Sequence, residues 1–347
     1  MQEIKGRLLY VLANQTGLLF YKMSFYLVDL STSKKRVVCK VPAGGKSILL
    51  SQMRLLSRLR RLEPKCCGRL SETEFVVSLL RACWLVDIAK CSCERICKVP
   101  EGFSDVINFC STSDGVYWGD YGRNKEHREV RVYKFSRDHR LSVVYSFTAG
   151  TVRHVHNIVC DNQGYFIFTG DNESCAGIYR VNHDWTEVLP WRVGQQKYRA
   201  VVGWPYCGGL LYATDSVETD NYIRLISGED DEKVLAPLNG SCIYGKGTKD
   251  EYLFSTTVEP HEGGGIRALF IDTLGTGIKS RDVTIVAVSK KDLSVRLVAS
   301  YQKDCWPMKI FQYGRVIFAG GQTESNAVWC SPVACEKYDG KSIKVEL

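Results

Sequence analysis

Long unbroken hydrophobic runs are missing from this sequence of 347 residues. The apolar stretch 8–20 near its start is interrupted by the polar and small residues Asn14–Gly17. It falls short of the roughly 18 apolar residues that a membrane-spanning helix needs, and it does not resemble a secretion signal. We therefore expect a cytoplasmic protein that has no membrane partner.

Extended amphipathic helical patterns are also scarce, which argues against folds that alternate strands with helices. Apolar residues make up 45% of the chain and charged residues 24%, so a large core can be buried and global disorder is excluded. The 18 Tyr, 13 Phe and 7 Trp residues suit β-strands and carbohydrate-binding surfaces equally well.

Complete disulfide pairing is excluded because the fifteen cysteines are odd in number. Most of them stand singly in apolar strands, as Cys110, Cys160 and Cys242 do. We expect free thiols in a reducing cytoplasm. The cysteines at 66–67 and 91–97 lack the spacing of a zinc ribbon and have no histidine nearby, so we assign no zinc site to them.

The net charge of +8 is partly concentrated in the segment 54–69, where six Arg and Lys residues accompany a single acid, Glu63. This segment is either a solvated basic surface or a site for an anionic partner, such as an acidic glycan or a phosphate-bearing compound. No nucleic-acid recognition motif accompanies it, so we do not expect a nucleic-acid partner.

One pattern recurs from about residue 103 onward. Each copy has an aromatic strand that follows a turn and stops at a small or polar residue, and two further strands come after it. These second strands end at or near Asp120, Asp171, Asp215, Thr257 and Gln322. Copies of roughly 40 to 65 residues have the size of a four-stranded propeller blade.

Two earlier segments, Gly6–Pro42 and Cys67–Pro100, fit the same pattern more loosely. The sequence thus predicts an all-β fold, a β-propeller of about seven four-stranded blades in a single domain over residues 1–347, with six blades as the alternative. Between these segments, apolar residues at 49, 53, 56 and 59 have helical spacing. We expect a helical insertion over 47–62, with an irregular strand as the alternative.

Several short motifs resemble known propeller families. The turns at 136–138, 182–185 and 289–292 resemble one half of the Asp-box turn of sialidase-type propellers. The stretch Arg153–Asn157, followed by Thr169–Asp171, resembles bacterial propellers described as glycosyl-hydrolase-like, and its His-x-His element resembles oligogalacturonate lyases, which hold a divalent metal on histidines. These resemblances cover about half of the chain, and WD-repeat and kelch signatures are absent. They imply a carbohydrate-active enzyme.

Propeller geometry predicts where the chemistry lies. In a four-stranded blade, the start of the innermost strand and the end of the second strand lie on one face, so residues at these places in successive blades converge at the channel mouth. The predicted starts of the innermost strands lie near Arg153, His154, His156, Tyr198, Arg199, Trp306 and Lys309. His261 lies in the longest loop, 258–282, which we interpret as a mobile flap.

His154 and His156 are the strongest candidates for a site. A spacing of two on a strand points both side chains the same way, roughly 6.5 to 7 Å apart. One divalent cation would bridge them if His261 or Asp171 completed the coordination shell. The alternatives are a catalytic role without a metal and a purely structural role.

Asp120, Asp171 and Asp215 would place three carboxylates on one rim, unless each merely caps a turn. Crowding would raise the pKa of at least one of them, which is how glycosidases obtain an acid and a base or nucleophile from two carboxylates. The other candidates for substrate binding fall into three classes. Arg153, Arg199 and Lys309 are cations that suit an acidic sugar. Trp118 and Trp306 are aromatic platforms that also suit blade cores, and Gln322 offers an amide.

The leading hypothesis is a glycoside hydrolase or a polysaccharide lyase that acts on an acidic oligosaccharide or polysaccharide. In the lyase version, His154 and His156, with or without His261, hold a cation, and Tyr198 or a neighbouring base removes the proton next to a uronate carboxylate. In the hydrolase version, two of the three aspartates act and no metal is needed. The alternative is a non-catalytic propeller that binds a glycan or a protein.

Overall fold

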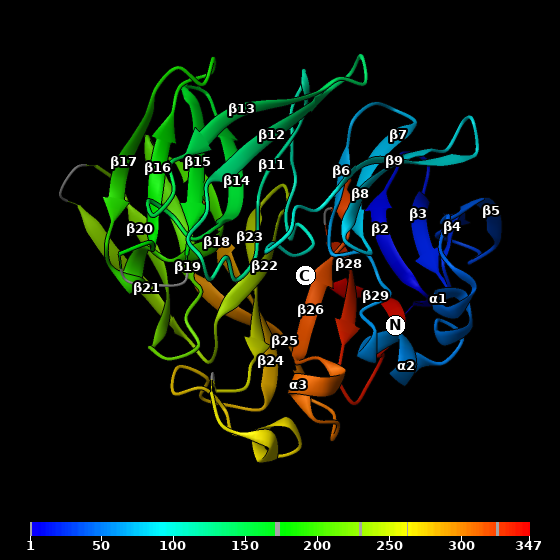
Figure 1. Cartoon of the computed structure of the whole chain (residues 1–347). Coiled ribbons are helices and arrows are strands. Elements are labelled where there is room, and N and C mark those ends of the chain that lie inside the picture. Colours follow the sequence, from blue (N-terminus) through cyan, green and yellow to red (C-terminus); the bar gives the residue numbers. More distant parts are fainter. Residues whose placement is uncertain (1, 171–173, 229–230, 262, 324–325) are drawn as a thin grey trace. The chain divides into compact units, whose positions relative to one another are not determined.

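The computed structural model describes residues 2–170, 174–228, 231–261, 263–323 and 326–347. Two compact units make up the chain. The smaller unit is residues 64–208, and the larger unit combines residues 1–63 with 209–347. Figure 1 labels the elements of both. The prediction of a single domain stays a prediction.

The smaller unit contains three antiparallel sheets of four strands each, in which neighbours in sequence are neighbours in the sheet. The strands are β6 (Cys67–Arg69), β7 (Glu74–Leu79), β8 (Ala82–Asp87) and β9 (Ser92–Lys98); β10 (Cys110–Ser111), β11 (Gly115–Gly119), β12 (Val130–Ser136) and β13 (Leu141–Phe147); β14 (Val155–Asp161), β15 (Gly164–Thr169), β16 (Gly177–Val181) and β17 (Val188–Val193). The short helix η1 (Gln196–Tyr198) and β18 (Ala200–Tyr206) complete this unit.

The larger unit has the same kind of antiparallel meander. Its strands are β2 (Arg7–Val11), β3 (Thr16–Tyr21), β4 (Ser24–Asp29) and β5 (Lys35–Lys40); β19 (Gly209–Thr214), β20 (Asn221–Ile226) and β21 (Glu232–Leu238); β22 (Cys242–Gly247), β23 (Glu251–Val258), β24 (Asp282–Ser289) and β25 (Val295–Gln302); β26 (Gly314–Phe318), β28 (Ala327–Val333), β29 (Lys341–Glu346) and β1 (Glu3–Lys5). The two-residue strand β27 (Gly320–Gly321) pairs in parallel with β2.

Burial follows the position of a strand in its meander. The second strands β11, β15 and β19 are buried along their whole length, whereas the fourth strands β13 and β17 are largely exposed. Strands covered on both faces are expected to have continuous apolar sequences, and these second strands are the aromatic runs of the repeat. The recurring pattern in the sequence therefore indicates which strand of each meander is buried.

A β-bulge recurs between the third and fourth strands. Within the described residues, six meanders shift register at this place, next to Phe25, Cys83, Val132, Ile178, Ile223 and Ile285. A bulge adds twist to the strand that carries it. Its repetition shows that the meanders are copies of one structural unit.

The fold is all-β, a β-propeller with about seven four-stranded blades, as the sequence predicts. The loosely matching segments Gly6–Pro42 and Cys67–Pro100 each form four strands. The sheet that contains β26, β28 and β29 takes its fourth strand from β1, which pairs with β29.

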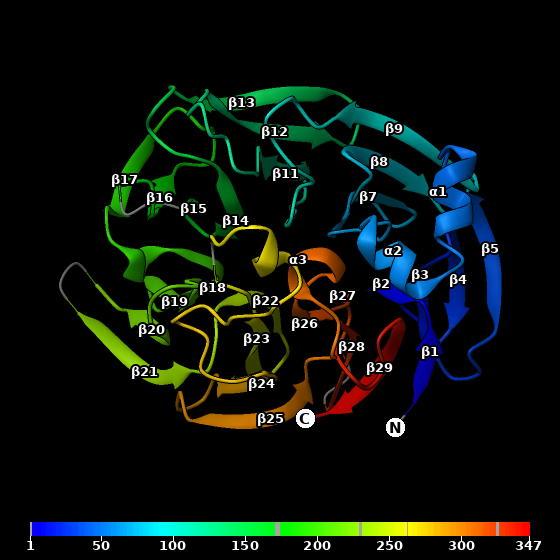
Figure 2. The ribbon, with the colours of Figure 1, turned by 60° about the horizontal axis from the view of Figure 1, so that its bottom comes forward.

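Short helices interrupt the strands of the larger unit. The segment 47–62 contains most of α1 (Gly45–Leu50) and all of α2 (Arg54–Leu59). The loop 258–282 contains η2 (Ile266–Leu269), and α3 (Met308–Phe311) follows later in the chain. Figure 2 shows these helices from the side on which they gather. Among the described residues, no helix has the length and apolar character required to cross a bilayer.

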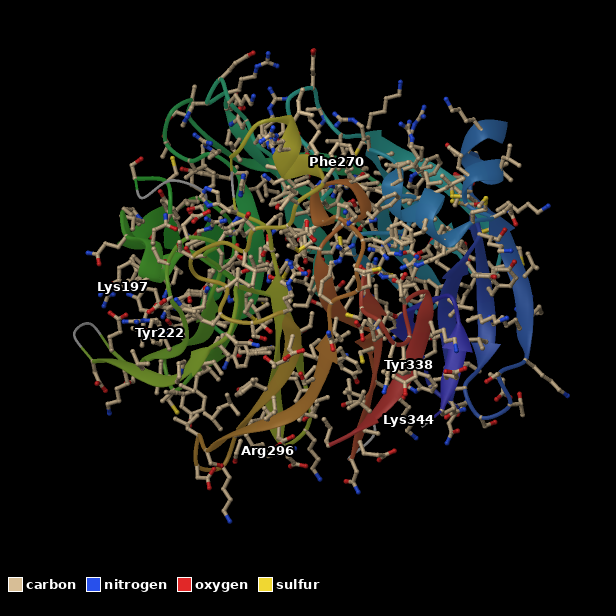
Figure 3. The ribbon with its side chains drawn as sticks, turned by 90° about the horizontal axis from the view of Figure 1, so that it is seen from below. Lys197, Tyr222, Phe270, Arg296, Tyr338 and Lys344 are labelled. Atoms are coloured by element: carbon tan, nitrogen blue, oxygen red, sulfur yellow. The ribbon has the colours of Figure 1, made fainter. Side chains whose placement is uncertain are left out.

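The loop 258–282 is fastened at several described points. The Lys309 side chain donates to the carbonyl of Gly263, and the main-chain N–H of Met308 donates to the Asp272 carboxylate at 2.8 Å. Phe270, just after η2, is 64% exposed (Figure 3). These contacts tie parts of the loop to α3, while the side chains of Ile266, Phe270 and Ile271 are exposed.

Candidate functional site in the smaller unit

The two histidines lie side by side at the start of β14. The register changes from Val155 opposite Thr169 to Asn157 opposite Phe168, so His156 occupies a β-bulge. The centroids of the His154 and His156 rings are 4.6 Å apart. Both side chains point the same way, as the spacing predicts, but the rings are in direct contact.

Main-chain carbonyls hold both imidazoles. His154 Nδ1 lies 2.5 Å from the oxygen of Gly122, and His156 Nδ1 lies 2.9 Å from the oxygen of Ala200. A carbonyl oxygen only accepts, so each Nδ1 carries a proton, and in the neutral form of either ring the lone pair lies on Nε2. The residues are 2% and 3% exposed, which fixes their orientation.

A glycine and a tyrosine shape the surroundings of the pair. A Cβ atom on Gly170 would lie 2.1 Å from Cε1 of His156, so only glycine permits this ring position. The Tyr121 ring centroid is 4.7 Å from that of His154 and 6.0 Å from that of His156. Sequence reasoning missed Tyr121, although it directly follows Asp120 at the end of a second strand.

The electrostatics keep His156 neutral. Burial lowers its pKa well below the usual value, and the nearby His154 and Arg199 charges lower it further. The hydrogen bond to Ala200 opposes this shift but does not overcome it. At neutral pH, His156 is therefore a neutral imidazole with its lone pair on Nε2.

Arg153 is bound to neighbours within the smaller unit. Its guanidinium donates to Nε2 of His127 at 3.1 Å, and its carbonyl accepts from the Asn124 side chain at 2.9 Å. The buried Asn124 amide also donates to the carbonyl of Arg128. The segment that supplies the Gly122 carbonyl is thereby fixed against the strand that carries His154.

Asp120 borders a small, mostly apolar cavity of about 40 Å³, lined in part by Trp118, Tyr121 and Tyr133. Burial raises the pKa of its carboxyl to about 6, although it accepts hydrogen bonds from the Arg131 main chain at 3.0 Å and from Tyr133 at 3.4 Å. The carboxyl can thus act as an acid near neutral pH.

The remaining candidates of this unit have mixed surroundings. Trp118 is 3% exposed and stacks on Tyr133 at 5.7 Å within an apolar core, which fits the core alternative for this aromatic residue. Tyr198 ends η1, is buried, and has the Lys197 ammonium 4.7 Å from its ring centroid. Arg199 lies close enough to lower the pKa of His156.

Five candidates belong to the larger unit: Asp215, His261, Trp306, Lys309 and Gln322. Asp215 is buried just after β19, and Gln322 is exposed after β27. His261 Nδ1 pairs with Glu218 at 2.9 Å, and Trp306 packs edge-on against Phe311 at 5.4 Å.

Asp171 lies outside the described residues, so a prediction from the propeller geometry stays a prediction: a single cluster of His154, His156, Asp171, Arg199 and Asp215. Of its members, His154, His156 and Arg199 lie close together in the smaller unit. Among the described residues, no three or more His, Cys, Asp or Glu side chains form a group that could hold a metal ion. The metal site formed by His154, His156 and His261 also stays a prediction.

No family model and no curated protein sequence matches this chain. Solved structures resemble it in fold. It is similar to the AfRom2 CNH domain (TM-score 0.56, 8% identity, 99% of this chain and 94% of that chain) and to a chain of a mitotic checkpoint complex (TM-score 0.55, 8% identity, 98% and 89%). An oligogalacturonate lyase in complex with manganese matches with a TM-score of 0.54 and 9% identity over 98% of this chain and 88% of that one. Identities this low show the propeller fold alone.

Proposed function

We propose that this protein is a carbohydrate-active enzyme that acts on an acidic oligosaccharide or polysaccharide at the His154–His156 pair. The observation that carries the proposal is the pair itself, two buried imidazoles in ring contact with both Nδ1 atoms bound to main-chain carbonyls. Such anchoring sets the tautomer and orients Nε2 for chemistry.

The surroundings of His156 suit proton removal next to a carboxylate. Its neutral Nε2 would accept the proton on the carbon that bears the uronate carboxyl group. The carbon–oxygen bond on the adjacent carbon would break, a double bond would form between the two carbons, and the departing oxygen would take up a proton. Arg199 would neutralise the uronate carboxylate, whose charge grows as the proton leaves.

The histidines fit a divalent cation in part. Metal-binding histidines usually donate their other ring N–H to a carbonyl or carboxylate, as both do here. The oligogalacturonate lyase of similar fold is a manganese complex. Because the described residues supply only two ligands of this kind, the reaction above runs through the chain's own groups.

A hydrolase is the second candidate, and Asp120 favours it. A carboxyl group with a pKa of about 6 can donate a proton to a leaving oxygen at neutral pH. The second carboxylate that this mechanism needs would be Asp171. This version predicts that Asp120→Asn abolishes turnover, whereas the lyase version predicts a smaller effect.

One assay separates these functions. The protein is incubated with polygalacturonate, alginate and a neutral galactan, and new reducing ends and the ultraviolet absorbance of unsaturated uronates are recorded. A lyase yields both signals, a hydrolase yields reducing ends alone, and a binding protein yields neither but retains the polymer in affinity electrophoresis. Absence of both product signals for the acidic polymers would contradict the proposal, whether or not the polymer is retained.

Variants connect the activity to the histidine pair. His156→Ala and Gly170→Ala should each lower the initial rate by about 100-fold or more, since one removes the base and the other displaces its ring. Gly265→Ala is the matched control, because a Cβ atom there meets nothing within 4 Å. Unchanged rates in folded His156→Ala protein would return the histidines to a structural role.

A further inference from the structure

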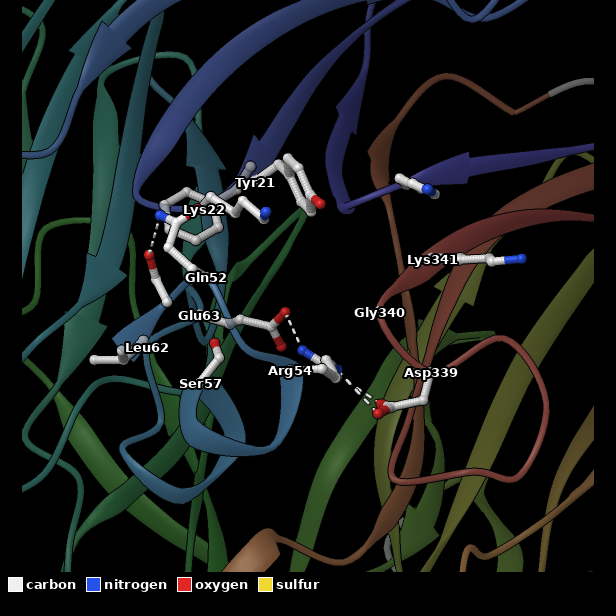
Figure 4. A pocket seen from close by; sticks show the side chains of 13 residues that line it. Tyr21, Lys22, Gln52, Arg54, Ser57, Leu62, Glu63, Asp339, Gly340 and Lys341 are labelled. Carbon is white, nitrogen blue, oxygen red and sulfur yellow. Dashed lines mark hydrogen bonds and ion pairs between the residues drawn. The ribbon is translucent and has the colours of Figure 1, made fainter. Parts of the chain in front are cut away.

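A second pocket lies in the larger unit, at a place where segments distant in sequence meet. It has a volume of about 210 Å³ and is lined by the ends of β1 and β3, by α2 and by the turn before β29. Figure 4 shows Tyr21 and Lys22 on one side of this space and Arg54 with Glu63 on the other. None of its lining residues belongs to the histidine pair.

The floor of the pocket is fixed by ion pairs. Arg54 forms a two-point contact with Asp339, at 2.9 and 2.6 Å, and a third bond of 2.5 Å to Oε1 of Glu63. Arg58 lies 3.3 Å from the same Asp339 carboxylate. The two acids of the pocket are thus neutralised within the fold, and Arg54 is held in one orientation.

Cations are in surplus above this floor. Lys5, Lys22 and Lys341 line the walls, and only Lys341 has a carboxylate partner among the described residues, Glu3 at 2.7 Å. The Lys22 and Lys35 ammonium groups each lie 5.3 Å from the Tyr21 ring centroid. Burial and the charge of Lys5 lower the pKa of Lys35, as expected where like charges crowd together.

Polar groups with unused hydrogen-bonding capacity converge on the same space. Ser57 is only 7% exposed, and within the described part of the chain its hydroxyl forms no hydrogen bond. The Tyr21 hydroxyl and Oε2 of Glu63 likewise have no hydrogen-bond partner there. These groups line the pocket and suit a ligand that supplies both donors and acceptors.

Apolar surface completes the pocket, because Phe20, Leu62 and the ring of Tyr21 also line it. An aromatic face beside alternating donors and acceptors suits the C–H face and hydroxyls of a sugar ring. We propose that this pocket binds one acidic monosaccharide unit, whose carboxylate or phosphate is held by Lys5 and Lys22. Tyr21, Ser57 and Glu63 bind the sugar hydroxyls.

The inference does not rest on the proposed enzymatic activity. The basic segment 54–69 is also interpreted differently, because Arg54 and Arg58 form ion pairs with acidic residues of the protein itself. The cations left for a ligand come from β1 and from the turn after β3.

Calorimetry with three sugars tests the pocket. Galacturonate, galactose 6-phosphate and galactose are titrated into the full chain at low salt. At least one acidic sugar should bind about tenfold more tightly than galactose, because charge-assisted hydrogen bonds are stronger than neutral ones. The ratio between the two acidic sugars tells carboxylate from phosphate.

Paired variants locate the binding. Lys22→Gln should remove the preference for the acidic sugar. Tyr21→Phe deletes one hydroxyl and should lower the affinity for all three sugars about threefold or more. Lys233→Gln is the control, because Lys233 is 62% exposed on β21 and its substitution changes the net charge equally. The absence of saturable binding by any of the sugars would overturn the proposal. So would equal losses in Lys22→Gln and Lys233→Gln, with both variants folded by circular dichroism.

Discussion

At the scale of single residues, burial favours the uncharged form of two titratable groups in the smaller unit. It lowers the pKa of His156 and raises that of Asp120, because a low-dielectric site penalises the charged form of each. The same cause thus provides a neutral base and a carboxyl group that retains its proton to higher pH.

Asp120→Asn should change how stability depends on pH. The native carboxyl has a pKa of about 6, compared with an ordinary value of 3.8, so between these values the native state holds a proton that the unfolded state has lost. Wild-type stability conferred by this group is full below pH 3.8 and is lost as the pH rises through 6, by up to about 3 kcal/mol. The variant should therefore be more stable than wild type at pH 7.5 and not at pH 4, as measured by urea unfolding.

The control for this experiment is Asp138→Asn, which alters an exposed aspartate in the turn after β12. The difference in unfolding free energy between Asp138→Asn and wild type should not rise between pH 4 and pH 7.5, as it should for Asp120→Asn. If Asp120→Asn and wild type have parallel stability profiles, the carboxyl is solvated rather than buried.

The residue-scale predictions from sequence succeeded where they used periodicity. The sequence predicted that His154 and His156 lie together, and their rings are in contact, although His154 precedes β14. The sequence could not provide their ring contact, because that depends on the bulge at His156 and on the carbonyls of Gly122 and Ala200. These acceptors are main-chain atoms, which leave no signature in a side-chain pattern.

At the scale of elements, turn chemistry and aromatic runs were sufficient to predict the meanders. The segment 47–62 was harder, because its apolar spacing predicted one helix and the structure has α1 and α2. The position of α2 depends on tertiary contacts of Arg58, which is 1% exposed. Its Nη1 pairs with Asp304, and its Nε donates to the carbonyl of Phe311 at 2.7 Å. A basic run in the sequence looks the same whether its members are solvated or buried.

Arg58→Met should therefore destabilise the protein strongly. The change removes a buried ion pair with Asp304, which keeps Lys303 as its other cationic partner, and the hydrogen bond to the Phe311 carbonyl, at a cost of about 2–4 kcal/mol. Arg60→Ala, at the exposed end of α2, should change stability by no more than about 0.5 kcal/mol. Urea unfolding at neutral pH measures both. Similar small losses in the two variants would show that Asp304 is solvated once Arg58 is removed.

At the scale of the whole molecule, the reactivity of the fifteen cysteines depends on which of them are buried. All are free, and they divide into four exposed, four intermediate and seven buried residues. In native protein, an aromatic disulfide reagent should react quickly with the exposed thiols: Cys91, Cys160, Cys207 and Cys305. Denatured, unreduced protein should react with close to fifteen equivalents. A large shortfall after denaturation would reveal disulfides and contradict the assignment to a reducing compartment.

The last prediction concerns the strand β1, which completes a sheet whose other members come from the far end of the chain. Glu3, Ile4 and Lys5 pair with Ile343, Ser342 and Lys341 of β29. Ile4 is 2% exposed and packs in a core cluster with Leu8 and Trp329. This core joins residues more than 300 positions apart, so folding requires a contact of very large sequence separation.

Ile4→Ala tests whether this contact contributes to stability. Truncating a buried isoleucine costs about 2–5 kcal/mol, and here the loss should also loosen β1 and expose the edge of β29. Glu3→Ala is the matched control, because it removes only a half-exposed ion pair with Lys341 and should cost about 1 kcal/mol or less. Urea unfolding gives the stabilities, and hydrogen exchange at residues 341–346 reports the edge. If Ile4→Ala costs no more than Glu3→Ala and leaves exchange unchanged, β1 does not hold this sheet together. Faster exchange confined to β29, with the expected loss of stability, would establish that the first strand of the sequence supports the last.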